Sequence, residues 1–172
     1  MLGPLAAAVL AALAFAAVGV GDIDRYHRID ERVAIGAQPT PPQLAALAEA
    51  GFHAVLNLRE ESEFDGEPEA LAAKDAGLLY LRVPVSSKGP SDAAVEEFLH
   101  VTDDAGIYPL FVHCATANRS AALWMVRRVL RDGWTREAAE TEAAGAGLTS
   151  VPMRDFARDY IRRHAPGKGA AP

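Results

Sequence analysis

The chain has 172 residues, of which 50% are apolar and 23% are charged, and its net charge is −6. This length and composition indicate one globular domain and exclude a disordered, collagen-like or coiled-coil chain. The acidic balance also argues against nucleic acid as a partner, because domains that bind nucleic acid are usually basic.

The chain begins with an unbroken apolar run at residues 5–20, which is typical of the hydrophobic part of a signal peptide. We expect residues 1–21 to be a signal peptide or membrane anchor, and the protein to be exported or attached to a membrane. No Lys or Arg precedes the run, so a misassigned start codon and a cytoplasmic domain remain the alternative. The folded domain is predicted at 22–165, and residues 166–172 read as a disordered tail.

The rest of the chain alternates between strand-like and helix-like segments. In chain order we predict strand 32–37, a helix capped by Thr40 and closed by Gly51, strand 53–58, an acidic loop at 60–67, helix 68–76, strand 78–85, a helix capped by Ser91, strand 108–113, and helices 120–131, 135–148 and 153–164. Strands that alternate with helices indicate an α/β fold with a central, mostly parallel sheet flanked by helices.

The carboxyl ends of parallel strands lie along one edge of a sheet, and ligands bind at that edge. Three segments follow directly after predicted strands, and they begin at Arg59, at Ser86 and at Cys114. We expect them to converge on one site.

The segment after the last strand carries the strongest chemical signal. Its sequence is His113-Cys114-Ala115-Thr116-Ala117-Asn118-Arg119-Ser120, and a helix follows. Small residues let the backbone curl so that its N–H groups bind an anion, and the N-terminus of the helix adds positive potential. Both effects favour the thiolate form of Cys114, the only cysteine. Arg119 is suited to grip an oxyanion by two parallel hydrogen bonds, Ser120 to stabilise a thiolate leaving group, and His113 to hold the loop.

This loop resembles the active-site loop of cysteine-dependent phosphatases, which runs His-Cys, five residues, Arg, then Ser or Thr. It also resembles the loop of rhodanese-type sulfurtransferases, which has four residues between Cys and Arg, as this chain has. Over about residues 25–150 the chain is most similar to the phosphatase-like domain of beta-lactamase-hydrolase-like proteins, a bacterial dual-specificity-phosphatase-like family. The matching stretches are 36–39, 55–59, 82–85, 113–124 and 133–134.

The resemblance implies a dual-specificity-phosphatase-like fold and a hydrolase that needs no cofactor and no metal. In this interpretation Cys114 attacks phosphorus, Arg119 and the backbone from Ala115 through Thr116, Ala117 and Asn118 hold the oxyanion, and Ser120 assists breakdown of the thiophosphoryl intermediate. Arg59 is a candidate second anion ligand, with an ion pair to the acidic loop as the alternative. The substrate is expected to be a phosphorylated small molecule or a phosphoprotein. The oligomeric state is not predicted.

The chain departs from the family pattern in three places. Ala117 stands where the family usually has Gly, and the loop is one residue shorter than in phosphatases. The general-acid Asp that phosphatases carry before the loop is missing from residues 86–88, so Asp92 is the nearest substitute, with Glu63 or Asp65 as further candidates. Asp92 also suits the first turn of its own helix, where a carboxylate is stabilising.

Two other functions remain open at this point. Cys114 is also suited to carry a persulfide in a rhodanese-like sulfurtransferase with a sulfane-sulfur donor, because that reaction needs no general acid. A catalytically weak module that only binds anions is the third interpretation.

Overall fold

The computed structural model describes residues 18–63 and 66–165 and contains a five-stranded sheet with the order β1-β2-β5-β3-β4. The strands are β1 (His27–Arg28), β2 (Val33–Gly36), β3 (Ala54–Asn57), β4 (Leu79–Arg82) and β5 (Leu110–His113). All neighbouring strands pair in parallel except β1, which runs antiparallel to β2. The predicted α/β fold with a mostly parallel sheet is therefore confirmed.

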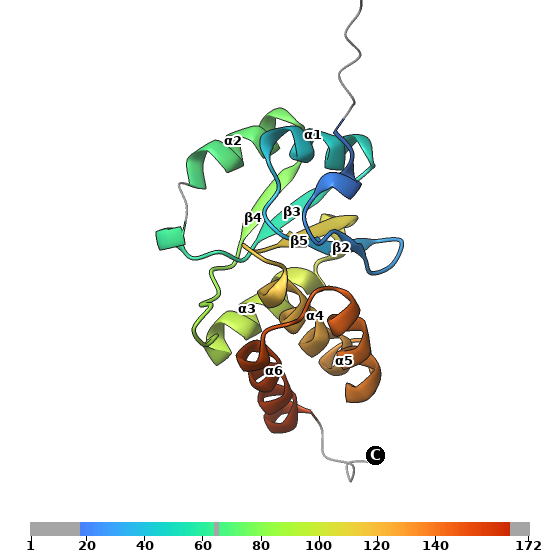
Figure 1. Ribbon diagram of the computed structural model, residues 1–172, viewed down its shortest axis with the longest axis vertical. Coiled ribbons are helices and arrows are strands. Elements are labelled where there is room, and N and C mark those ends of the chain that lie inside the picture. Colours follow the sequence, from blue (N-terminus) through green and yellow to red (C-terminus); the bar gives the residue numbers. More distant parts are fainter. Residues whose placement is uncertain (1–17, 64–65, 166–172) are drawn as a thin grey trace, which may run out of the picture.

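Helices cover both faces of this sheet (Figure 1). One layer holds α1 (Pro41–Glu49) and α2 (Gly66–Asp75). The other layer holds α3 (Asp92–Asp103), α4 (Asn118–Leu130), α5 (Arg136–Gly145) and α6 (Val151–His164). Short 3₁₀ turns lie at Val20–Asp22, Glu61–Glu63 and Ala105–Ile107.

The central strand β5 shows why two layers are needed. All four of its residues are buried, and successive side chains point to opposite faces. Leu110 and Val112 join the core beneath α3 to α6, whereas Phe111 joins the core beneath α1 and α2. Gly36 on β2 makes room for the Phe111 ring, because a Cβ there would lie 2.8 Å from it.

Most element boundaries agree with the sequence predictions. Ser91 caps α3 by accepting a hydrogen bond from the Ala94 N–H, and the Thr40 N–H donates to the Gln43 side chain at the start of α1. Helix α4 begins at Asn118, two residues before the predicted start. Strand β1 was missed, because two residues carry no periodic signal.

The predicted leader and tail fall largely outside the described residues, which begin at 18 and end at 165. Among the residues that are described, no helix has the length and apolar character needed to span a membrane. Export or membrane attachment stays a prediction.

Candidate active site

The chain leaves the centre of the sheet at Cys114 and enters α4 four residues later. Cys114 is 1% exposed. Thr116 is tied to the strand beside it through a bridge to Ala37, and its carbonyl accepts a hydrogen bond from Arg25 Nη1 at 3.1 Å. The loop is thus fastened on the side of β2, directly in front of the N-terminus of α4.

Ala117 adopts a left-handed backbone conformation, with φ at +64°. An L-residue in this region costs about 1–2 kcal/mol relative to Gly, because its Cβ crowds the following carbonyl. The residue that stands where the family usually has Gly is therefore a strained point of the loop. Ala117 is also fully buried, and a Cβ at Gly147 would lie 3.4 Å from its methyl group.

Arg119 lies in the first turn of α4 and is held by a carboxylate and a carbonyl. Its Nη1 lies 2.5 Å from Glu63 Oε2, and its Nη2 donates to Glu63 Oε1 at 2.6 Å. Nη1 also donates to the Val85 carbonyl at 2.9 Å. These contacts leave Nε–H and one Nη2–H, which share one edge of the guanidinium.

Cys114 and Glu63 both act on the charge of Arg119. Burial works against the charged form of Arg119, but the hydrogen bonds that Arg119 donates to Glu63 and the electrostatic interaction with Cys114 outweigh it and raise the Arg119 pKa. The same hydrogen bonds from Arg119 lower the pKa of Glu63, against the opposing effect of burial. Arg119 is therefore a cation that Glu63 holds in place and whose charged form Cys114 also stabilises.

A pocket of about 290 Å³ opens in front of the loop. It is lined by Glu63, Ser87, Ala115, Thr116, Asn118, Arg119, Ser150 and Met153. Loop, helix and acidic-turn residues meet here, as the convergence of strand ends predicts. Within the described parts of the chain, no three potential metal ligands lie close enough to hold an ion.

Asn118 and Ser120 stand on either side of Arg119 and differ in their surroundings. Asn118 Oδ1 accepts hydrogen bonds from the backbone N–H groups of Thr149 and Ser150, at 2.8 and 2.7 Å. It thereby fixes the α5–α6 connection that forms one wall of the pocket. Ser120 is fully buried, and its hydroxyl has no hydrogen-bond partner among the described residues.

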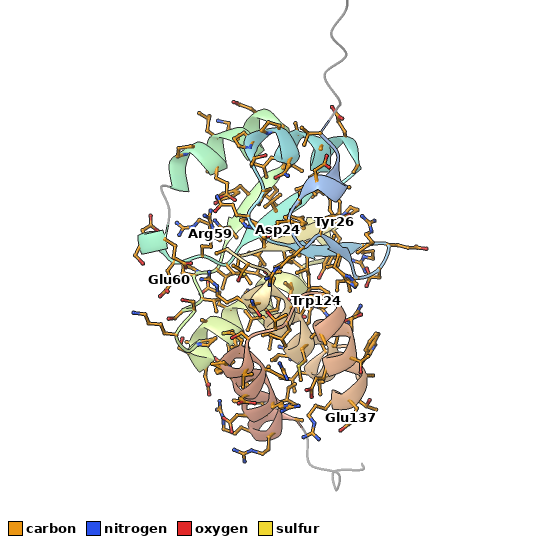
Figure 2. All side chains as sticks on the ribbon, viewed as in Figure 1. Asp24, Tyr26, Arg59, Glu60, Trp124 and Glu137 are labelled. Carbon is orange, nitrogen blue, oxygen red and sulfur yellow. The ribbon has the colours of Figure 1, made fainter. Side chains whose placement is uncertain are left out.

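Arg59 does not reach the pocket. It is buried at the level of the sheet, between the two helix layers (Figure 2). It forms an ion pair with Glu69, at the start of α2, and donates to the Gln38 side chain. This geometry does not support the expected role of Arg59 as a second anion ligand. The ion pair that the structure shows for Arg59 is with Glu69 of α2, whereas the alternative had placed its partner in the acidic loop.

Asp92 also lies away from the pocket. It is the first residue of α3, and both of its oxygens accept hydrogen bonds from Arg163, near the end of α6. That pairing lowers the Asp92 pKa, so the carboxyl group is held ionised. The expectation that Asp92 substitutes for the general acid is not supported by this position. Asp65, the other candidate in the acidic loop, lies outside the described residues.

Sequence reasoning missed the partner of Arg119. Glu63 was considered only as an acid that could swing into the site, yet the structure gives it an ion pair with Arg119. It also missed Ser150 and Met153 as pocket walls. Glu63, Ser150 and Met153 are distant from the loop in the sequence, so no short sequence pattern links them to the pocket.

Comparisons with known proteins agree with the fold. The family model described as DSP-PTPase phosphatase fused to NAD+ kinase matches residues 13–157. A beta-lactamase hydrolase-like protein of Xylella fastidiosa is 31% identical over 127 residues, which are 70% of this chain and 28% of the relative. One from Agrobacterium fabrum is 32% identical over 107 residues, 60% of this chain and 25% of the relative. The chain thus spans about a quarter of the length of these relatives.

Solved structures show the same architecture. A DUF442 protein from Shewanella putrefaciens superposes with a TM-score of 0.72 at 22% identity, covering 86% of this chain and 97% of that one. The catalytic domain of the PP-IP phosphatase SIW14 from S. cerevisiae gives 0.70 at 16% identity, covering 86% and 93%. The resemblance to beta-lactamase-hydrolase-like proteins is confirmed, and the chain belongs to the family of DSP-PTPase phosphatase domains that the family model describes.

Proposed function

We propose that this domain is a cysteine-dependent phosphatase that hydrolyses phosphoesters through a thiophosphoryl-enzyme intermediate. The observation that carries the proposal is the relation between Arg119 and Cys114. Glu63 and the carbonyls of Val85 and Leu58 take up Nη1 and one N–H of Nη2, and the remaining Nε–Nη2 edge has two parallel N–H donors on a cation whose charge Cys114 also stabilises. Two donors at that spacing match two oxygens of a phosphoryl group.

In the first step the Cys114 thiolate attacks phosphorus, a P–S bond forms, and the P–O bond to the leaving group breaks. The leaving oxygen takes the electron pair of that bond, and water supplies a proton where the leaving group needs one. Arg119 and the N–H groups at the start of α4 stabilise the charge that builds up on the equatorial oxygens. In the second step water attacks phosphorus, the P–S bond breaks, and inorganic phosphate and the thiolate are released.

Ser120 is suited to the second step. A buried hydroxyl without a partner is uncommon in proteins, and its proton is available to the sulfur as negative charge returns to it. The pocket lining does not include Cys114 itself, so a substrate must approach through the cradle formed by Ala115, Thr116 and Arg119.

The rhodanese-like alternative keeps one specific observation in its favour, which is the loop with four residues between Cys114 and Arg119. In that reaction the thiolate takes the sulfane sulfur of thiosulfate and releases sulfite, and cyanide then removes the sulfur as thiocyanate. No proton donor is needed in either step.

One experiment separates the two. Hydrolysis of p-nitrophenyl phosphate and transfer of sulfur from thiosulfate to cyanide are measured side by side on the full chain and on Cys114→Ser. The p-nitrophenolate leaving group departs without protonation, so a missing general acid does not hide a phosphatase. The proposal expects phosphate release that depends on Cys114. Thiocyanate alone would establish the sulfurtransferase, and binding of phosphate without any turnover would establish the anion-binding module.

A further inference from the structure

A buried carboxylate lies beneath the active-site loop on the side of α2. Glu69 is 6% exposed, although carboxylates are rarely buried without partners. Its Oε2 forms the ion pair with Arg59 and accepts a hydrogen bond from Asn57 Nδ2 at 3.3 Å. Its Oε1 lies 2.8 Å from His113 Nε2. One carboxylate therefore connects the ends of two neighbouring strands, β3 and β5.

The position of His113 makes this contact relevant to the site. His113 is fully buried and directly precedes Cys114, and its ring stacks on Phe111 with the centroids 5.9 Å apart. Its carbonyl accepts a hydrogen bond from the Leu58 N–H at 2.9 Å. Once the ring and the carbonyl are both fixed, little freedom remains in the direction in which the chain enters Cys114.

The charges around Glu69 determine where the proton of His113 sits. A lone pair on Nε2 would repel the Glu69 carboxylate at 2.8 Å, so a hydrogen on Nε2 fits this contact, which is a close electrostatic contact and not an aligned hydrogen bond. Arg59 already neutralises the single negative charge of Glu69. Nδ1 is buried without a partner among the described residues, so a second N–H there would have no acceptor. The arrangement therefore fits the tautomer with its hydrogen on Nε2.

We infer that Glu69 is a positioning residue that fixes the tautomer and orientation of His113, and through them the position of Cys114 and its loop. The role of Glu69 in turnover rests on the proposed phosphatase function. The expected effects of Glu69 on the His113 ring and on the reactivity of the Cys114 thiol do not depend on that function. The positioning role of Glu69 and the phosphatase function can therefore be refuted separately.

The test compares the full-length chain with its Glu69→Gln variant. Glu97→Gln, at an exposed position on α3, is the control, because it also removes one carboxylate. Long-range ¹H–¹⁵N spectra report the His113 tautomer, with the signal assigned from His113→Gln. The rate of Cys114 alkylation by iodoacetamide against pH reports the thiol. Besides Glu69, the charged groups that bear on this pair are Arg59 next to Glu69 and Arg119 with Glu63 next to the sulfur.

We expect the Nε2–H tautomer in the wild type. In Glu69→Gln we expect mixed tautomers, alkylation at neutral pH about tenfold slower, and kcat at least tenfold lower with a smaller change in KM. Glu97→Gln should match the wild type in all three. A Glu69→Gln variant that loses thermal stability but keeps the tautomer and the alkylation profile would overturn the inference.

A second variant covers the case in which Glu69→Gln does not fold, because that substitution leaves Arg59 buried opposite an amide. Glu69→Asp keeps the charge but shortens the reach to His113 by one methylene group. We expect it to fold and to show the same changes in tautomer and alkylation in weaker form. An Nδ1–H tautomer in the wild type would also overturn the inference.

Discussion

Arg119 and Glu63, which lie 56 residues apart in the sequence, form a two-point ion pair with N···O distances of 2.5 and 2.6 Å. The pair uses the Nη1–Nη2 edge of the guanidinium. A carboxylate in this position leaves the Nε–Nη2 edge open to an oxyanion and holds that edge in place.

Replacing Glu63 with Gln tests this arrangement. The amide offers one acceptor instead of two and removes the opposite charge, so Arg119 loses its fixed orientation. We expect kcat/KM for p-nitrophenyl phosphate to fall about tenfold to a hundredfold, the size of a lost hydrogen bond to a charged group. A lower KM with an unchanged kcat would instead mean that Glu63 blocks the oxyanion position.

The pH dependence tests whether Glu63 serves as a general acid. Its pKa is lowered from the usual 4.5, because Arg119 stabilises the carboxylate. The ion pair is therefore fully formed above pH 4.5 and is lost only as the pH falls through the lower folded-state value. Between about pH 5 and 8, wild type and Glu63→Gln should have kcat/KM profiles of the same shape. A limb that falls with rising pH in the wild type and is absent from the variant would identify Glu63 as an acid.

Asp92→Asn should leave turnover at the wild-type level, since Asp92 is paired with Arg163 away from the pocket. Steady-state kinetics with an alkyl phosphate, whose leaving group needs a proton, is the most sensitive measurement. A hundredfold or larger fall in kcat with the alkyl phosphate would identify Asp92 as the general acid.

The strain at Ala117 is tested by a pair of substitutions. Ala117→Gly relieves a positive φ but gives the unfolded chain more freedom, so the free energy of unfolding should change by less than about 1 kcal/mol. Ala117→Val places a β-branched side chain in the same buried, left-handed position and should cost more than about 2 kcal/mol. Urea denaturation measures both, and equal stabilities for the two variants would contradict the strain.

Asn118 is tested by Asn118→Asp and Asn118→Ala. Asp keeps the oxygen that accepts from the Thr149 and Ser150 N–H groups, whereas Ala leaves both without their acceptor and should cost about 1–3 kcal/mol. Asp also adds a negative charge to the pocket lining and loses the donation from Nδ2 to Thr116, so it should weaken phosphate inhibition and lower the thermal midpoint less than Ala does. Loss of stability in both variants alike would refute the acceptor role.

The loop from Cys114 to Ser120 was predictable because its reactive and anion-binding residues are consecutive in the sequence and follow an apolar strand. The sheet was predictable because its strands are separate, buried runs. Glu63 and Glu69 were not, because their partners Arg119 and His113 come from distant segments that only the fold brings together. The ion pair between Asp92 and α6 was not predictable for the same reason, whereas the short strand β1 was not predictable because two residues carry no periodic signal.

The most direct measurement is a rapid acid quench of the full-length chain with p-nitrophenyl phosphate, followed by mass spectrometry of the peptide that contains Cys114. The account predicts one phosphoryl group on Cys114, formed at the rate of the p-nitrophenolate burst and absent from Cys114→Ser. Turnover without a phosphorylated Cys114 peptide, or turnover that survives in Cys114→Ser, would contradict it.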